Sequence, residues 1–237
     1  MATIVLCHGA WSSAWAWKKV RPLMAADGHT FFTPSYTGLG ERHHLASDHI
    51  DLETHIADVL GVLEYEDLRD IVLMGHSYGG MVATGVADRA RDRIKLLVYL
   101  DAFAPKDGQA LADLVPPAAR QGMKDSAHAN HGFVMPNPSP GDTSPEDLAW
   151  ISKYRRPQSL RCFEQPLGLQ GEMSVPRVYI QCMQYAAKGP FSQFGEHAKT
   201  HNDWKFYELD ASHSPNVTNP QGLMKVLGQA FDDAGIK

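Results

Sequence analysis

One serine of this chain lies in a context that can turn its hydroxyl into a nucleophile. Residues 75–80 read Gly-His-Ser-Tyr-Gly-Gly, so Ser77 is the centre of a G-x-S-x-G pattern. An apolar run at 71–74 precedes the pattern, and a stretch of helical period at 81–90 follows it. At a strained strand-to-helix turn, small residues let the backbone pass closely and the turn lifts the serine hydroxyl above the sheet. We therefore predict that Ser77 is a nucleophile.

A serine hydroxyl is a weak nucleophile and needs a neighbouring base. The chain has 12 histidines, and only His213 lies between the last predicted strand, at 205–209, and the predicted final helix. A serine followed by a histidine near the C-terminus is one of the known chain orders for such a pair. We predict that His213 is the general base.

Backbone N–H groups beside a nucleophile can stabilise the negative charge that develops on a substrate oxygen. Tyr78 directly follows Ser77, and Ala10 lies in the segment His-Gly-Ala-Trp at 8–11, where the first apolar run ends. We predict that the N–H groups of Ala10 and Tyr78 form an oxyanion hole. His8 occupies a packed strand end, and we interpret it as structural.

These residues need a scaffold that brings them together. Short apolar runs alternate with longer segments of helical period, which is typical of a parallel sheet with crossover helices. We expect strands at 3–6, 30–33, 71–74, 94–100, 177–182 and 205–209, and helices at about 14–26, 51–64, 81–90 and 220–234. The sequence thus predicts an α/β fold with a mostly parallel, doubly wound sheet.

The regular alternation stops between residues 103 and 175, where prolines interrupt short helical pieces. This stretch carries apolar side chains, such as Trp150, that a solvated linker would not need. We predict a small, mainly helical cap insertion at 104–175, with residues 1–103 and 176–237 forming the core.

Charge and composition exclude several classes of function. The 237 residues include 22 lysines and arginines against 27 aspartates and glutamates, a net charge of −5, with no long basic run. The chain therefore lacks the electrostatic footprint of a nucleic-acid-binding protein. No stretch approaches the roughly 20 consecutive apolar residues that span a bilayer, and the N-terminus lacks the pattern of a signal peptide. We expect a cytoplasmic protein without nucleic-acid or membrane partners.

The sequence favours neither a metal nor a cofactor. Cys7, Cys162 and Cys182 are widely spaced, unlike the ligands of a zinc site or a disulfide framework, and we expect buried free thiols. The histidine pair at 43–44 has no third ligand at a recognisable spacing. The Gly-Leu-Gly run at 38–40 lacks the third glycine of a dinucleotide-binding fingerprint. We predict no metal and no cofactor.

Several segments resemble the α/β-hydrolase superfamily, and the similarity extends over essentially the whole chain. The chain more closely resembles the branch that holds plant methylesterases, hydroxynitrile lyases and related bacterial esterases. The segments that carry this resemblance are His-Gly-Ala-Trp at 8–11, Tyr-Thr-Gly-Leu-Gly-Glu-Arg at 36–42, Gly-His-Ser-Tyr-Gly-Gly at 75–80, Tyr-Leu-Asp-Ala-Phe at 99–103 and Ser-His-Ser-Pro at 212–215. The resemblance implies the α/β-hydrolase fold and cleavage of esters through an acyl-enzyme.

Two positions separate the esterases of this branch from its lyases. The lyases carry a threonine where this chain has Gly9, and a lysine directly after the catalytic histidine, where this chain has Ser214. Because both lyase residues are absent, the resemblance implies ester hydrolysis rather than cyanohydrin cleavage.

The acid of the triad cannot lie where this branch usually has it. In the branch the acid follows the strand that corresponds to 178–182, and the matching position here is Tyr185; no aspartate or glutamate occurs at 173–195. Haloalkane dehalogenases of one subgroup and cofactor-free ring-opening dioxygenases keep the acid just after the preceding core strand, where this chain has Asp101. We assign Asp101 as the triad acid, with Asp210 as the second choice.

The sequence thus predicts a serine hydrolase that cleaves small carboxylic esters and has a small-molecule ester as its partner. We expect Gly9, Trp11, Phe103 and Trp150 to line the substrate pocket, and a homodimer is among the assemblies open to the chain. The alternatives are an amide or carbamate hydrolase with the same triad, a cofactor-free lyase or dioxygenase using a histidine–aspartate dyad, and a non-enzymatic ligand receptor.

Overall fold

The computed structural model describes residues 1–137, 143–185 and 189–236, and a six-stranded sheet organises them. The strand order is β2-β1-β3-β4-β7-β8, and all of these neighbours pair in parallel. The strands are β1 (Thr3–Cys7), β2 (Thr30–Phe32), β3 (Ile71–His76), β4 (Ile94–Leu100), β7 (Arg177–Cys182) and β8 (Trp204–Leu209). The predicted α/β fold with a parallel, doubly wound sheet is confirmed.

Strand β3 lies in the interior of the sheet and is buried along its whole length. Its Leu73 is opposite Val5 of β1 on one side and Leu97 of β4 on the other. A strand covered on both faces needs apolar side chains pointing both ways, which explains the unbroken apolar run at 71–74. This strand delivers the chain to Ser77.

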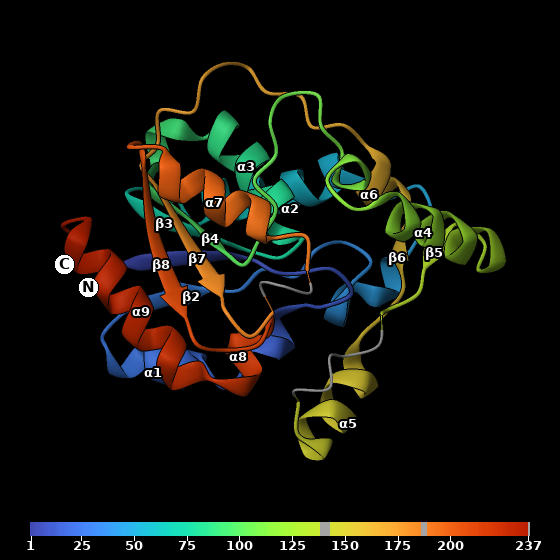
Figure 1. Ribbon diagram of the computed structural model, residues 1–237, viewed down its shortest axis with the longest axis horizontal. Coiled ribbons are helices and arrows are strands. Elements are labelled where there is room, and N and C mark those ends of the chain that lie inside the picture. The colour runs from blue at the N-terminus through green and yellow to red at the C-terminus, as the bar shows by residue number, and fades with distance from the viewer. Residues whose placement is uncertain (138–142, 186–188, 237) are drawn as a thin grey trace.

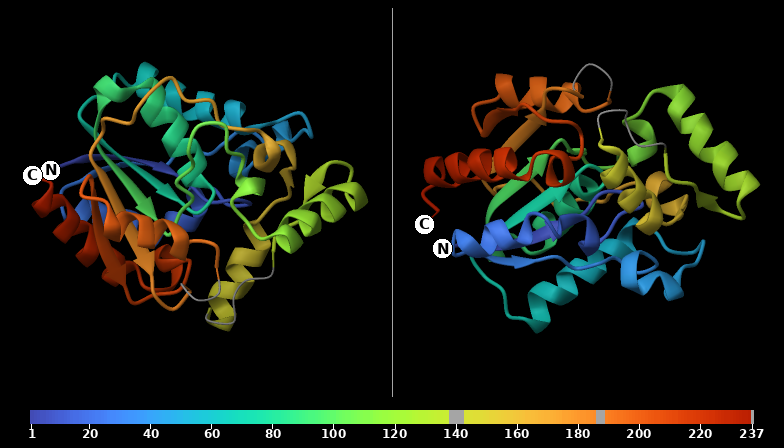
Figure 2. Two further views of the ribbon diagram at one scale, coloured as in Figure 1. Left: turned by 45° about the horizontal axis from the view of Figure 1, so that its top comes forward. Right: turned by 90° about the horizontal axis from the view of Figure 1, so that it is seen from below.

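Helices cover both faces of the sheet (Figures 1 and 2). On one face lie α1 (Arg21–Ala26) and α9 (Pro220–Asp233). On the other lie α2 (Leu52–Tyr65), α3 (Gly79–Arg89) and α7 (Ser192–Thr200). Each face buries its own apolar cluster. The two layers hold the sheet from both sides, and the chain termini lie close together (Figure 2).

The predicted helix at 14–26 is divided in the structure. A 3-10 helix, η1 (Ala14–Trp17), is followed by the separate α1, in which Pro22 occupies the first turn. Proline has no N–H to donate to the carbonyl four residues earlier, so a helix can begin at Pro22 but not run through it unbroken. The break still buries Trp17 completely against the sheet.

The described part of 104–175 carries helices and strands that lie beyond the sheet, on the side away from the chain termini, and its residues 165–175 run back past α3 to β7 (Figure 1). It contains α4 (Pro117–Ala129), α5 (Pro145–Tyr154), α6 (Arg161–Glu164) and an antiparallel pair, β5 (Phe133–Val134) with β6 (Gln158–Ser159). We did not predict this small sheet, because strands of two residues leave no periodic pattern in a sequence.

The other described elements are short. They are η2 (Gly40–Leu45), η3 (Arg91–Arg93), η4 (Leu111–Asp113) and α8 (Pro215–Thr218). Within the described ranges, no helix is both long enough and apolar enough to cross a bilayer.

Candidate active site

Ser77 lies at the turn between β3 and α3 in a left-handed backbone conformation, with φ of 56°. Only a few per cent of non-glycine residues have a positive φ, so the surrounding contacts must hold it. The Ser77 carbonyl accepts hydrogen bonds from the N–H groups of Gly80 (3.0 Å) and Phe103 (3.2 Å). Its own N–H points to the carbonyl of Leu100 (3.4 Å). The strand-to-helix turn predicted from the sequence is therefore present and tied to β4.

Two glycines make this turn possible because the backbone passes them closely. A Cβ atom added at Gly79 would lie 2.0 Å from the carbonyl oxygen of Cys7, and one added at Gly80 would lie 2.0 Å from that of Phe103. Both obstacles are backbone atoms, which cannot rotate away as a side chain could. Any larger residue would push α3 away from β1 and β4 and displace Ser77.

Asp101 and His213 are in direct contact. Asp101 follows β4, has φ of 40° and is completely buried. Its Oδ2 accepts a hydrogen bond from His213 Nδ1 at 2.6 Å, and its Oδ1 accepts one from the Cys182 N–H at 3.2 Å. These bonds compensate the burial of the carboxylate. Because Nδ1 is engaged, Nε2 is the His213 nitrogen available for proton transfer.

Aromatic rings and a second histidine fix the imidazole of His213. The Phe191 ring stacks on it with centroids 4.7 Å apart, and the Tyr185 ring lies 4.9 Å away. His76 Nε2 donates a hydrogen bond to the His213 carbonyl at 2.7 Å. Burial, followed by the nearby His213, lowers the pKa of His76 to about 3, so His76 stays neutral. Our sequence reasoning gave His76 and Phe191 no role, because His76 fills a variable position of the G-x-S-x-G pattern and Phe191 lies outside every motif considered.

The second choice for the acid lies elsewhere. Asp210 is exposed, and its carboxylate accepts a hydrogen bond from Gln184 at 3.0 Å. Tyr185, at the position where related enzymes usually carry the acid, instead places its ring beside His213. Of the two aspartates considered from the sequence, the structure brings Asp101 to the histidine.

The two residues assigned to the oxyanion hole flank Ser77. Within the described residues, neither the Ala10 N–H nor the Tyr78 N–H donates to a protein acceptor. The Tyr78 hydroxyl is anchored by His55 Nδ1 at 2.9 Å, and His55 Nε2 donates to the Thr37 carbonyl at 3.2 Å. Burial lowers the pKa of His55 to about 4, which keeps it a neutral acceptor for the hydroxyl. The turn thus offers two backbone donors on a fixed frame.

His8 is buried and makes hydrogen bonds within the fold. Its Nδ1 donates to the Gly9 carbonyl (2.9 Å), its Nε2 accepts from the Tyr36 N–H (3.3 Å), and its ring stacks on Tyr36 with centroids 3.8 Å apart. Burial lowers its pKa to about 3. These contacts agree with a structural residue that supports the segment at 8–11.

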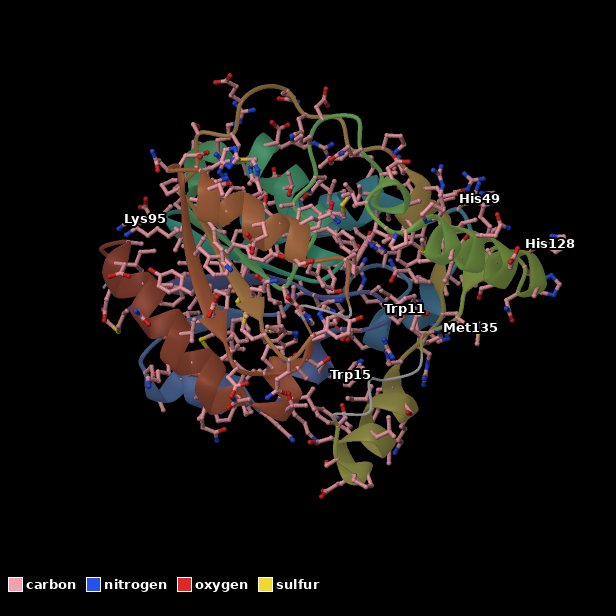
Figure 3. The ribbon with its side chains drawn as sticks, viewed as in Figure 1. Trp11, Trp15, His49, Lys95, His128 and Met135 are labelled. Atoms are coloured by element: carbon pink, nitrogen blue, oxygen red, sulfur yellow. The ribbon has the colours of Figure 1, made fainter. Side chains whose placement is uncertain are left out.

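A cavity of about 660 Å³ opens above Ser77 and His213. Gly9, Trp11 and Phe103 line it, as expected. Figure 3 shows Trp11 and Trp15 on the side of the core next to α5 and Met135 between α4 and α5, and these three residues also line the cavity. Apolar side chains from α4 and from the segment after β5 complete the wall, so the cavity suits a small ligand with an apolar body.

The prediction that Trp150 lines the pocket is wrong. Trp150 does not border the cavity; its ring packs edge-on against Trp15, with centroids 5.5 Å apart, and lies under the ammonium of Lys18 at 4.2 Å. Successive helix residues point about 100° apart, and the next residue of α5, Ile151, is the one that reaches the cavity. The periodicity of a short helix in an insertion did not reveal which of its faces points inward.

Other side chains that could bind metals are occupied or dispersed. His43 and His44 each contact a nearby backbone carbonyl, of Gly38 and Glu41 respectively. Across the described ranges, no group of three or more histidine, cysteine, aspartate or glutamate side chains could hold a metal ion. The three cysteines are free and buried, as expected.

Comparisons with known proteins agree with this geometry. Residues 4–226 match the alpha/beta hydrolase family. The carbendazim hydrolyzing esterase of Nocardioides sp. (strain SG-4G) is 38% identical over 96% of this chain and 98% of that protein. Methylesterase 2 of Arabidopsis thaliana is 28% identical over 76% of this chain and 77% of that protein.

Solved structures show the same architecture. An extracellular alpha/beta-hydrolase from a Paenibacillus species, described as homologous to tobacco salicylic acid binding protein 2, superposes with a TM-score of 0.83 and 26% identity, covering 97% of this chain and 99% of that one. A methylesterase from Arabidopsis superposes with a TM-score of 0.77 and 25% identity, covering 98% and 99%. The chain belongs to the alpha/beta hydrolase family, in the esterase branch that includes the plant methylesterases.

Proposed function

We propose that this carboxylic ester hydrolase uses Ser77 as its nucleophile, His213 as its general base and Asp101 as the acid that orients the base. The observation that carries the proposal is the 2.6 Å contact between Asp101 Oδ2 and His213 Nδ1, at a cavity that Ser77 also lines. A buried carboxylate on Nδ1 selects the tautomer whose Nε2 can take a proton, and it stabilises the imidazolium that results.

In the first half of the reaction, Ser77 Oγ attacks the ester carbonyl carbon while His213 Nε2 takes the hydroxyl proton. The N–H groups of Ala10 and Tyr78 stabilise the oxyanion of the tetrahedral intermediate. The intermediate collapses to an acyl-enzyme, and the leaving alkoxide takes the proton from His213. In the second half, water attacks the acyl carbonyl, His213 takes the water's proton and returns it to Ser77, and the carboxylic acid leaves.

The residues around Ser77 support hydrolysis rather than cyanohydrin cleavage. A Cβ atom at Gly9 would lie 3.2 Å from the Ser77 Cβ, which is tighter than most contacts of this kind. Gly9 thus leaves the space beside the nucleophile free, where the lyases of this branch place a threonine. Ser214, in place of their lysine, adds no cation next to His213.

The substrate class follows from the cavity and from the relatives. We propose small esters, including alkyl carbamates, because the same attack on a carbonyl carbon releases an alcohol from either. The carbendazim hydrolyzing esterase supports the carbamate, since carbendazim is a methyl carbamate. We also propose that residues 104–175 act as the cap that selects the acyl or alcohol group. A homodimer and a cytoplasmic location stay predictions from the sequence.

A fluorophosphonate probe tests the covalent mechanism, because only an activated serine reacts rapidly with it. We expect intact-mass measurement to show one probe per wild-type chain and none on Ser77→Ala. We also expect Ser77→Ala to lower ester turnover by at least about 10⁴-fold, since triad members act as a unit.

The matched control is Ser152→Ala, which removes an exposed hydroxyl on α5. This variant should label and turn over like the wild type. Rapid labelling of Ser77→Ala, or ester turnover near the wild-type rate in that variant, would exclude Ser77 as the nucleophile.

A further inference from the structure

The described wall of the cavity carries one permanent charge, and that charge is positive. Among the described residues that line the cavity, Arg155 has a fixed charge, and no aspartate, glutamate or lysine lines it. His76 and His213 also face the cavity, but His76 is held neutral by burial and His213 serves the reaction. The net charge of the chain is −5, so a positive charge in the described wall of the substrate site is not explained by an excess of basic residues.

Within the part of the chain that the structure describes, most N–H donors of the Arg155 guanidinium have no partner. Arg155 follows α5, and its Nη1 donates to the Asn137 carbonyl at 2.6 Å. A guanidinium has five N–H donors, and the described residues supply no other acceptor and no carboxylate partner for this one. Burial lowers the pKa of Arg155 from its ordinary value, yet arginine stays charged in proteins. Among the described residues, the guanidinium thus has no ion-pair partner, although it is partly buried.

A rigid aromatic platform holds this guanidinium in the cavity. Its central carbon lies 5.4 Å from the centroid of the Trp11 ring. Both nitrogens of Trp11 are anchored: the backbone N–H donates to Gln158 Oε1 and the indole Nε1 donates to the Val134 carbonyl, each at 2.9 Å. Because Trp11 directly follows Ala10, the platform is continuous with the segment that supplies the proposed oxyanion hole.

We propose that Arg155 determines specificity by binding a carboxylate on the substrate, so that the preferred substrates are half-esters that carry a second, ionised acid group. This inference rests on the proposed ester hydrolysis at Ser77. A planar guanidinium with free N–H groups matches a carboxylate in a two-bond pairing, and the desolvated site strengthens that pairing. The apolar walls would hold the chain between the two carbonyl groups.

The test compares kcat/KM for monomethyl esters of straight-chain dicarboxylic acids, from glutarate to suberate, with methyl esters of monocarboxylic acids of equal carbon number. Because the esters differ in chain length, the preferred length reports the distance between Ser77 and the guanidinium of Arg155. At the best length we expect the wild type to prefer the half-ester by about 10-fold or more, chiefly through KM. Arg155→Met should lower this preference by about 10- to 100-fold, and Arg155→Lys should retain part of it.

The matched control is Arg161→Met, which removes an exposed arginine outside the cavity and should leave the preference unchanged. If Arg155→Met does not fold, Arg155→Gln keeps a donor for the Asn137 carbonyl and removes the charge. A preference that falls no further in the Arg155 variants than in Arg161→Met would overturn the proposal. So would a wild type that favours the neutral ester at every length.

A binding measurement separates this inference from the catalytic proposal. Calorimetry on Ser77→Ala with monomethyl adipate and with methyl hexanoate requires no turnover. We expect the half-ester to bind more tightly, because it alone carries a carboxylate, and the added Arg155→Met substitution should remove the difference. Tight binding of the half-ester without esterase activity in the wild type would contradict the proposed function alone, and equal binding of the two esters would contradict the role of Arg155.

Discussion

Two walls enclose the cavity. The core wall is formed by the lining residues outside 104–175, and the cap wall is formed by the lining residues within 104–175. The walls differ in how firmly neighbouring atoms hold their residues. On the core wall, the Ser77 carbonyl accepts two backbone hydrogen bonds and the Tyr78 side chain is fully buried. On the cap wall, the lining residues of α4 are half-buried or exposed and Met135 is 44% exposed, whereas Leu111, Val134 and Phe163 are buried. Bond-making groups need fixed positions, whereas a surface that receives different substrates can adapt.

The cap wall is joined to the core by the hydrogen bonds of Trp11 to Gln158 and Val134 and by further contacts at its rim. Lys19 Nζ forms an ion pair with Asp147 of α5 at 2.7 Å, and Trp150 packs on Trp15. Lys19 is about one third exposed, and pairs of this kind contribute about 1 kcal/mol or less. We therefore expect substitutions at the cap wall to change substrate preference, and substitutions at the core wall to change the rate for every substrate.

The largest effect should come from the acid behind the core wall. Asp101→Asn keeps the shape of the side chain but removes the negative charge beside His213 Nδ1 and disturbs the tautomer of the imidazole. In a known triad this change costs about 10⁴ in rate. We expect a loss of that order in kcat for all esters tested, approaching the loss caused by His213→Ala. Steady-state kinetics on two esters of different size measure it.

Asp210→Asn is the matched control, because its exposed carboxylate binds Gln184 instead of His213. It should change kcat by less than about twofold. A large loss in Asp210→Asn together with a small one in Asp101→Asn would show that the acid was assigned to the wrong aspartate, while the roles of Ser77 and His213 would stand.

The second effect concerns stability towards acid. Burial lowers the pKa of His8 and of His76 to about 3 and that of His55 to about 4. Between pH 6.5 and about 4 the unfolded chain therefore binds protons that the folded chain does not. The stability supplied by these neutral histidines is complete above pH 6.5 and is lost as the pH falls.

Well below pH 6.5 each histidine contributes a slope on the order of 1 kcal/mol per pH unit, and between pH 7 and 6 it contributes less, because the unfolded imidazole is then only partly protonated. Urea unfolding at pH 7, 6 and 5 gives the free energy of unfolding directly. His8→Gln should reduce this slope by the contribution of one histidine, about a third of the total for the three. A free energy of unfolding that stays constant over this range would show that these three histidines are not held neutral by the fold.

The sequence predicted the core wall far better than the cap wall, and the reason is physical. Ser77, His213 and Asp101 follow strands or adjoin turns whose apolar runs and glycines are readable, so their neighbourhood follows from the topology. In 104–175 the pattern of α5 does not show which of its faces points inward, and the prediction for Trp150 is wrong for that reason. Arg155 was missed because an isolated arginine after a helix resembles any surface cation until its environment is known.

Glycines give the smallest and sharpest test of the contrast between the two walls. Gly79 lies behind the core wall, where an added Cβ would lie 2.0 Å from a backbone oxygen of β1. Gly122 lies in α4 on the cap wall, where an added Cβ would meet nothing within 4 Å. We expect Gly79→Ala to lower the free energy of unfolding by about 3 kcal/mol, or to prevent accumulation of folded protein, because neither backbone can yield cheaply.

Gly122→Ala should instead raise the free energy of unfolding by about 0.5 to 1 kcal/mol, because alanine loses less backbone entropy than glycine inside a helix. Urea unfolding at pH 7.5 measures both variants under one condition. A gain in Gly122→Ala that is also seen as a higher urea midpoint would place α4 within the cooperatively folding unit. If the gain is absent while Gly79→Ala is destabilised, α4 must unfold before the core, and the cap wall would then be the separately adjustable half of the site.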